Sequence, residues 1–246
     1  TNLPQPFSSA FHLHGYGEPL FDPNLMQKAA IVTDQFPISR TIIYTTLGVR
    51  RPESYLKNLL VKGKIKGIFV SFYGFQESTY DIVHKGGDFH TARKNLIYLA
   101  KLNAELGHPC SLRVQLLQPH TVNLIRNDPK EEKAFNEFYE ALSPYGIELQ
   151  TIGLHNYGDG RDFIDTEKIQ TVCSVVDGVR KTDLNVSWQL KIVPCCFDSN
   201  NTIVFGDLRE QSIYEIYHSE KYKKFIDSHI SGKLDDYPVC KGCNMR

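Results

Sequence analysis

The hydrophobic and polar positions follow two alternating patterns along the first two-thirds of the chain. Short runs of β-branched and aromatic residues predict strands, and most are followed by stretches whose apolar residues recur every three or four positions, as in amphipathic helices. The predicted strands lie at residues 11–14, 40–46, 65–72, 112–117 and 148–154. The predicted helices lie at residues 23–34, 52–61, 90–106 and 129–142. This alternation predicts an α/β fold in which helices flank a parallel sheet.

The pattern changes in the last third of the chain, where the regular alternation stops. Residues 186–193 and 202–205 predict short strands, and residues 212–228 predict a helix. We therefore expect two domains, an α/β domain over residues 1–160 and a small α+β domain rich in cysteine over residues 161–246.

Several unusual residues occupy the carboxyl ends of the predicted strands, where ligands bind in parallel α/β folds. These positions are residues 15–18, 45–48, 71–74 and 155–157. Glu18 offers a carboxylate that can accept hydrogen bonds from a ligand ammonium group. Gly17 beside it permits close approach of the backbone to that ligand. The alternative is a solvated glutamate in a tight turn.

Five of the six cysteines lie in the last third of the chain. Cys240 and Cys243 enclose two residues, a spacing that lets two thiolates bind one metal ion or cluster. Cys173 together with Cys195 or Cys196 would complete a set of four. Four thiolates can hold a [4Fe–4S] cluster or a single Zn²⁺ ion, and the spacing leaves both open. Buried apolar cysteines without a metal are the third interpretation.

Charge and hydropathy narrow the range of partners. The chain has 28 basic and 28 acidic side chains, so it lacks the basic excess of nucleic-acid-binding proteins. No apolar run is long enough to cross a bilayer, and the start of the chain lacks the features of a signal peptide. Clustered cysteines in such a chain indicate metal or redox chemistry in a reducing compartment. We expect a cytoplasmic protein that binds neither nucleic acid nor a membrane.

Taken together, these segments resemble the radical S-adenosylmethionine enzymes. Gly-Tyr-Gly-Glu-Pro at residues 15–19 resembles the family's GGEP motif, Thr-Thr-Leu-Gly at 45–48 its TNG strand end, and residues 70–74 its xSxxG segment. Residues 194–198, 205–208 and 212–217 resemble the SPASM or twitch extension, which binds one or two auxiliary [4Fe–4S] clusters. The resemblance spans nearly the whole chain, with its segments in the family's order.

The resemblance implies a partial (βα)6-type barrel followed by the small auxiliary-cluster domain. The family binds its catalytic [4Fe–4S] cluster with a C-x-x-x-C-x-x-C motif on the first strand-to-helix loop, and this sequence contains no such motif. We expect the first βα unit, with the ligands of the catalytic cluster, to precede Thr1, so that this chain alone is inactive. The alternative is a homologue that has lost radical chemistry.

The resemblance also implies a set of cofactor-binding residues. The residues expected to bind S-adenosylmethionine or line its site are Gly17, Glu18, Thr46, Ser71, His155 and Asn156. Glu18 would meet the amino group of S-adenosylmethionine, and Ser71 its ribose or carboxylate. His155 and Asn156 would line the adenine or substrate side.

The resemblance assigns the auxiliary [4Fe–4S] cluster to Cys173, Cys195, Cys240 and Cys243. The family pattern has a glycine five positions before the second of these cysteines, within an Asp-Gly turn. Here Gln189 and Leu190 occupy that turn. This departure keeps Cys196 as an alternative to Cys195.

The implied activity is generation of a 5′-deoxyadenosyl radical that abstracts hydrogen from a C–H bond of a peptide or small-molecule substrate. A reductant such as flavodoxin or ferredoxin would supply electrons, and the auxiliary cluster would transfer them. Two other interpretations stay open: a non-catalytic iron–sulfur or zinc scaffold, and a metal-independent βα-barrel enzyme with structural cysteines. We expect His12 and His14 to be hydrogen-bonded barrel residues and Cys110 to be a plain buried thiol.

Overall fold

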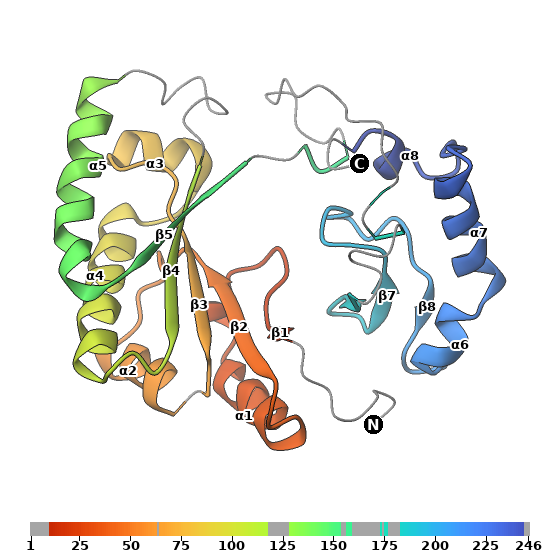
Figure 1. Cartoon of the computed structure of the whole chain (residues 1–246), viewed down its shortest axis with the longest axis horizontal. Coiled ribbons are helices and arrows are strands. Elements are labelled where there is room, and N and C mark those ends of the chain that lie inside the picture. The colour runs from red at the N-terminus through yellow and green to blue at the C-terminus, as the bar shows by residue number, and fades with distance from the viewer. Residues whose placement is uncertain are drawn as a thin grey trace. The chain divides into compact units, whose positions relative to one another are not determined.

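The chain divides into two compact units, which are described separately (Figure 1). The units are Pro4–Gly153 and Leu154–Arg246. The structure, a computed structural model, describes residues 10–62, 64–117, 128–153, 156–158, 173, 175–176 and 183–243. The domain boundary predicted at residue 160 falls outside these ranges. None of the helices in the described ranges combines the length and the hydropathy needed to cross a membrane.

Five parallel strands form a single sheet in the first unit, in the order β1–β2–β3–β4–β5. The strands are β1 (Ala10–His12), β2 (Arg40–Thr45), β3 (Gly67–Ser71), β4 (Ser111–Leu117) and β5 (Glu148–Ile152). Strands that follow one another in sequence are also neighbours in the sheet, which parallel pairing permits because each connection contains a helix. The predicted α/β class with a parallel sheet is confirmed. Its closure into part of a barrel stays a prediction.

The helices of this unit gather on one face of the sheet (Figure 1). They are α1 (Leu25–Gln35), α2 (Glu53–Val61), α3 (Glu77–Val83), α4 (Phe89–Glu105) and α5 (Pro129–Leu142), with the 3-10 turns η1 (Pro19–Phe21) and η3 (Ser143–Tyr145). Ile43 and Ile68 pair across β2 and β3 and are fully buried in one core with Leu59 of α2 and Leu96 of α4. Full burial of a side chain of this size contributes about 1.5–3 kcal/mol.

Helix α3 was not predicted from the sequence. Its first turn is closed by a capping box between Gln76 and Thr79. The buried carboxylate of Glu131, on α5, accepts hydrogen bonds from the backbone N–H of Phe75 at 2.5 Å, from Gln76 Nε2 at 3.0 Å and from Thr79 Oγ1 at 2.8 Å. Contacts with a distant segment therefore stabilise this seven-residue helix, and no local pattern reveals them.

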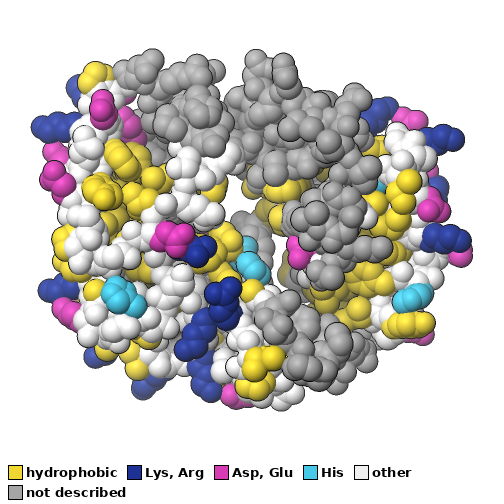
Figure 2. Space-filling model, viewed as in Figure 1, with side chains coloured by type: hydrophobic (Ala, Val, Ile, Leu, Met, Phe, Trp, Pro, Cys, Tyr) yellow, Lys and Arg dark blue, Asp and Glu magenta, His cyan; other side chains and the backbone are white. Residues whose placement is uncertain are grey.

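The second unit contains a three-stranded antiparallel sheet in the order β6–β7–β8. Its strands are β6 (Asn185–Val186), β7 (Lys191–Val193) and β8 (Gly206–Asp207), and its helices are α6 (Ile213–Tyr217), α7 (Glu220–Ile230) and α8 (Pro238–Lys241). Ile192, Phe205, Ile216 and Phe225 form its core. Figure 2 shows acidic and basic side chains on the outer surface of both units, in keeping with the equal numbers of the two charges.

Three predictions for this unit were wrong in detail. The strand predicted at 186–193 is a hairpin, and the strand predicted at 202–205 occurs just beyond it, as β8. The helix predicted at 212–228 is divided between α6 and α7, because the Ser219 hydroxyl accepts a hydrogen bond from the Tyr222 N–H at 3.2 Å and begins a new helix. The apolar spacing continues across this break, so periodicity alone does not reveal it.

The β6–β7 hairpin has a three-residue loop at residues 188–190. The N–H of Leu190 donates to the Ser187 carbonyl at 3.0 Å, and the N–H of Ser187 donates to the Lys191 carbonyl at 2.9 Å. Leu190 has φ of 59°, the left-handed conformation that closes such loops and that glycine usually supplies. The hairpin therefore forms with leucine in the position where the family pattern has glycine.

We expect the residue at position 190 to set the stability of the second unit. A left-handed conformation costs a residue with a Cβ about 1–2 kcal/mol, and a β-branched residue fits it least well. Leu190→Gly should therefore have a higher free energy of unfolding than the wild type, and Leu190→Val a lower one. The two variants should differ by about 1–2 kcal/mol. Urea unfolding monitored by circular dichroism measures the ranking. A valine variant as stable as the wild type would show that the conformation carries no strain.

Candidate functional site

Glu18 connects the loop after β1 with the end of β2. Its Oε1 accepts a hydrogen bond from the Leu20 N–H at 3.1 Å, which caps η1, and another from Thr45 Oγ1 at 2.5 Å. Its Oε2 accepts from the Thr46 N–H at 2.8 Å and from Thr46 Oγ1 at 2.9 Å. The structure thus brings together Glu18 and Thr46, two of the predicted site residues, and adds Thr45 to them.

The four donors to Glu18 differ in how freely they can move. Two are backbone N–H groups, which the fold holds in place. The other two are the hydroxyls of Thr45 and Thr46, which can rotate and can also accept hydrogen bonds. A cationic group that reached Glu18 could replace these hydroxyl donors while the backbone stayed in place. The site is therefore chemically suited to an ammonium group.

The space around the neighbouring glycines is open. A Cβ at Gly15 or Gly17 would have no other atom of the chain within 4 Å. The described part of the fold therefore does not itself require glycine at these positions, and approach of a ligand to the backbone remains the predicted reason for them. Ser71 is the last residue of β3, and the pairing of Thr45 with Val70 places it next to Thr46 at the same edge of the sheet.

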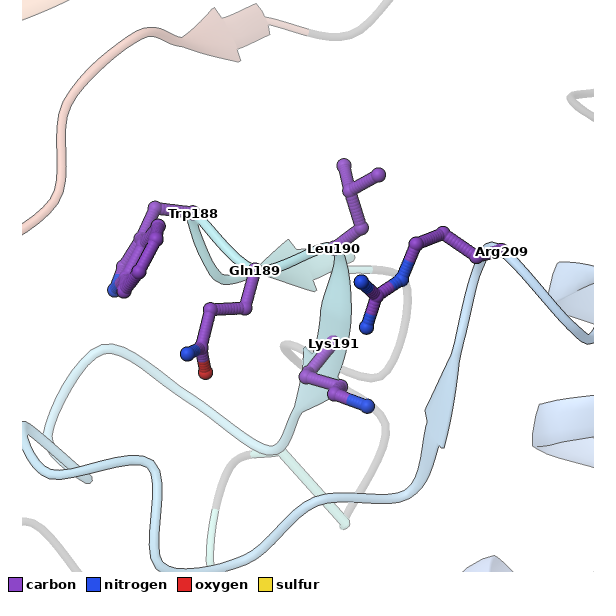
Figure 3. A pocket seen from close by; sticks show the side chains of 5 residues that line it. All are labelled: Trp188, Gln189, Leu190, Lys191 and Arg209. Carbon is purple, nitrogen blue, oxygen red and sulfur yellow. The ribbon is translucent and has the colours of Figure 1, made fainter.

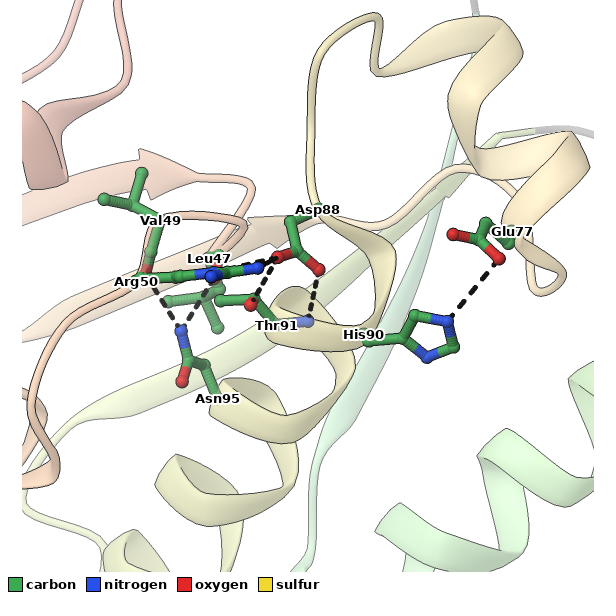
Figure 4. A network of polar contacts seen from close by, with 8 residues as sticks. All are labelled: Leu47, Val49, Arg50, Glu77, Asp88, His90, Thr91 and Asn95. Atoms are coloured by element: carbon green, nitrogen blue, oxygen red, sulfur yellow. Dashed lines mark hydrogen bonds and ion pairs between the residues drawn. The ribbon is translucent and has the colours of Figure 1, made fainter.

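The loop that carries Thr46 is anchored on α4 (Figure 4). Leu47 is buried with φ of 57°, a left-handed conformation. Asn95 Nδ2 donates hydrogen bonds to the carbonyls of Leu47 at 2.9 Å and Val49 at 3.2 Å. Asp88, which caps α4, also pairs with Arg50 at 3.2 Å. These contacts fix the backbone that presents Thr46 to Glu18.

The loop after β3 is held by a neutral histidine. The N–H of Tyr73 donates to Nε2 of His84 at 3.2 Å, and the two rings stack with centroids 5.0 Å apart. Because this nitrogen accepts a hydrogen bond, the ring carries its proton on Nδ1 when it is neutral. Burial lowers the pKa of His84 from 6.5 to about 4, so the ring stays uncharged at neutral pH.

The other face of the sheet, opposite the helices, carries a row of polar and aromatic side chains. The ring of Tyr44 lies 4.4 Å from that of His14 and 4.9 Å from that of Phe69, centroid to centroid. The guanidinium of Arg113 lies 5.0 Å above the Phe69 ring and pairs with Glu148 at 2.7 Å. Of these residues only His14 was a candidate from the sequence, because Tyr44, Phe69, Arg113 and Glu148 are ordinary residues for a strand.

His12 and His14 both pack against Tyr44, with ring centroids 5.9 and 4.4 Å from it. Burial, and then the nearby His12, lower the pKa of His14 to about 4. Both histidine rings therefore belong to the same row of side chains as Tyr44. Whether they belong to a barrel interior stays a prediction.

Cys240 of the second unit lies within electrostatic reach of three other cysteine thiols. Burial raises the pKa of Cys240, and the sulfurs of Cys195, Cys173 and Cys243 raise it further. Within the described ranges, no three His, Cys, Asp or Glu side chains form a group that could hold one metal ion.

Cys195 and Cys196 have different surroundings. Burial raises the pKa of Cys195 to about 11, whereas the backbone N–H groups of Phe197 and Asp198 hydrogen-bond to its sulfur and act in the opposite direction. Cys196 is exposed. Cys195 is among the residues that raise the pKa of Cys240, and the choice between Cys195 and Cys196 as a ligand stays a prediction. Cys110 is a buried thiol in the other unit, and burial raises its pKa to about 12.

Asn156 lies beside the turn that holds the last two cysteines. Its side chain is buried, and its Nδ2 donates a hydrogen bond to the Gly242 carbonyl at 2.7 Å. The sequence placed this residue on the adenine or substrate side of a ligand, whereas its described contacts are with this turn. His155 lies outside the described residues.

A pocket of about 350 Å³ lies on the β6–β7 hairpin (Figure 3). It is lined by Trp188, Gln189, Leu190, Lys191 and Arg209. Both of its cations already pair with Asp207, at 2.5 Å for Lys191 and 2.6 Å for Arg209. No predicted site residue lines it, so we do not take it as the functional site.

Comparison with known proteins gives matches along the whole chain. Residues 173–244 match the family model of SPASM, an iron–sulfur cluster-binding domain. The chain is also 23% identical over 240 residues to the S-adenosyl-L-methionine-dependent 2-deoxy-scyllo-inosamine dehydrogenase of Niallia circulans. That match covers 97% of this chain and 74% of the relative.

Two similar solved structures agree with the observed fold. The crystal structure of BtrN in complex with AdoMet and 2-DOIA has a TM-score of 0.56 at 20% identity, covering 97% of this chain and 74% of that one. The structure of anSMEcpe with bound AdoMet has a TM-score of 0.54 at 14% identity, covering 95% and 71%. These likenesses show the α/β fold with its parallel sheet.

We expect the free energy of unfolding to fall as the pH drops from about 6.5 towards 4. His84 and His14 both have a pKa of about 4 in the folded chain, whereas an unfolded histidine has a pKa of about 6.5. The unfolded state therefore binds more protons in this window, and stability present above pH 6.5 is lost below it. In His84→Gln the glutamine side chain can still accept the Tyr73 N–H, but it does not titrate. The variant should therefore lose about half of the pH dependence that the two histidines cause. Urea unfolding at several pH values measures the slope, and an unchanged slope would contradict the assignment.

Proposed function

Because the chain is a radical S-adenosylmethionine enzyme with a C-terminal SPASM domain, we propose that it abstracts hydrogen from a C–H bond of a peptide or small-molecule substrate. Bound S-adenosylmethionine and a reduced [4Fe–4S] cluster supply the radical chemistry, while the protein orients the reactants and keeps water away. The observation that carries the proposal is the set of three cysteine sulfurs around Cys240, all within the residues that match the SPASM model.

The auxiliary [4Fe–4S] cluster would be held by Cys173, Cys195, Cys240 and Cys243. The electrostatic influence of the other three sulfurs on Cys240 supports this set, because each of the four irons of a cluster takes one thiolate. The N–H groups directed at Cys195 would stabilise a thiolate, as hydrogen bonds to cluster sulfurs do. Four cysteine ligands leave no iron open to substrate, so we assign this cluster to electron transfer.

The ends of strands β1 to β3 would bind S-adenosylmethionine. Glu18 would accept hydrogen bonds from its amino group in place of the threonine hydroxyls, and the open backbone at Gly17 would leave room for it. Thr46 would then be free to contact the ligand through its released hydroxyl. Ser71, at the neighbouring strand end, would reach the ribose or the carboxylate.

The polar and aromatic row on the sheet face opposite the helices would meet the substrate. Tyr44, Arg113 and Glu148 offer hydroxyl, cationic and anionic groups on one surface. Such a surface suits a molecule rich in hydroxyl or amino groups, and the Niallia circulans relative is named for a small molecule of that kind. We further propose that flavodoxin or ferredoxin supplies the electrons and that the protein works in the cytoplasm.

The cluster assignment is tested by iron content. Protein purified without oxygen and reconstituted with iron and sulfide should be brown and hold about four irons per chain, the content of one [4Fe–4S] cluster. Serine in place of Cys173, Cys195, Cys240 or Cys243 should lower this content sharply. The controls Cys110→Ser and Cys196→Ser should retain it. Zinc in place of iron, or full iron content in all four variants, would refute the assignment.

The role of Glu18 is tested by binding of S-adenosylmethionine to protein that carries the catalytic cluster. Loss of a hydrogen bond to a charged group costs about 1.5–3 kcal/mol, so Glu18→Ala should weaken binding about tenfold or more. Asp22→Ala is the matched control, since Asp22 is a nearby carboxylate that pairs with Lys28 at 2.6 Å. Isothermal titration calorimetry measures both. Equal affinity of the Glu18 variant and the wild type would exclude this role.

A further inference from the structure

Asn156 fixes the peptide group that leads into Cys243. Its Nδ2 donates to the carbonyl of Gly242 at 2.7 Å, and its Oδ1 accepts from the N–H of Gly158 at 3.2 Å. The Gly242 carbonyl and the Cys243 nitrogen belong to one planar peptide unit. A hydrogen bond to that oxygen therefore restrains the plane from which the Cys243 side chain projects.

Gly158 packs directly on the same cysteine turn. It has φ of 67°, and a Cβ at this position would overlap the backbone oxygen and the side chain of Val239. Val239 precedes Cys240, so this close contact restrains the start of the turn while Asn156 restrains its end. The backbone within the turn is closed by its own bonds, from the Cys243 N–H to the Cys240 carbonyl at 3.3 Å.

Tyr157, in the same segment, contacts the loop after β7 that carries Cys195. Its ring lies edge-on to that of Phe197, with centroids 6.1 Å apart. The N–H of Phe197 is one of the two that bond to the sulfur of Cys195. Residues 156–158, the ligand clamp, thus contact both of the segments that carry Cys195, Cys240 and Cys243.

We propose that Asn156 is a positioning residue for the auxiliary cluster and that the ligand clamp sets the separation of the two cysteine-bearing segments. This inference rests on the proposed function, because it takes the four thiols as cluster ligands. Asn156 acts through the Gly242 peptide and does not itself touch the cluster. Its role is that of an outer partner that orients a ligand, a position at which substitution costs about 10–100-fold in metal affinity.

The test uses the whole chain reconstituted with iron and sulfide. Asn156→Asp keeps the shape of the side chain and the acceptor for Gly158 but loses the N–H group that donates to Gly242. Asn156→Ala removes the amide without adding a charge. Both should release iron to a ferrous chelator about tenfold faster than the wild type, with an altered electron paramagnetic resonance spectrum of the reduced cluster. Asn156→Gln, which restores an amide donor, should recover part of the retention.

Asn103→Asp is the matched control. Asn103 is equally buried in the other unit, and its amide bonds to the backbone of Cys110, with Nδ2 donating to the carbonyl at 3.0 Å. This variant should lose thermal stability yet release iron at the wild-type rate, which separates cluster positioning from folding. If Asn156→Asp does not fold, the rate at which Asn156→Ala releases iron tests the positioning role.

The outcomes separate this inference from the proposed function. If the wild type holds a cluster and both Asn156 variants release iron at the wild-type rate with an unchanged spectrum, the positioning role is overturned and the cluster assignment stands. If the wild type binds no cluster, the proposed function and the inference both fail.

Discussion

Parallel alignment of the five strands is the constraint on which the sheet unit depends. Because all five run in one direction, the loops after β1, β2 and β3 begin at the same edge. This is why Glu18, from the first loop, can accept hydrogen bonds from Thr45 and Thr46, at the end of the second strand. Because the strands also follow one another in sequence order, crossovers of one hand place the helices on one face of the sheet, and the other face carries the polar and aromatic row.

The elements that could be predicted from the sequence are those that local patterns encode. The five strands and four of the crossover helices follow periods of two and 3.6 residues and were found close to their positions. Helix α3 was missed because its partner Glu131 lies more than 50 residues further along the chain. The β6–β7 hairpin was mistaken for one strand because Leu190 stands where a glycine would mark the turn.

In the candidate site, too, the sequence near a residue predicts its position, whereas its contacts depend on distant segments. Glu18 and Thr46 were predicted from their places at strand ends and from the family resemblance, but their direct contact depends on the sheet register. No motif or pattern in the sequence marks Thr45 as a site residue, apart from its position beside Thr46. Asn156 was found for its position after the fifth strand, and the sequence could not show that its amide meets Gly242. Partner choice across such distances is decided by tertiary packing.

The hydrogen bond between Asn156 and Gly242 joins residues 86 positions apart. During synthesis the clamp segment leaves the ribosome well before residues 240–243 exist, and contacts between such distant residues are slow to form. The second unit therefore completes its fold only after Cys243 has emerged. Any inorganic group that needs Cys243 as a ligand can therefore be completed only after this region has been translated.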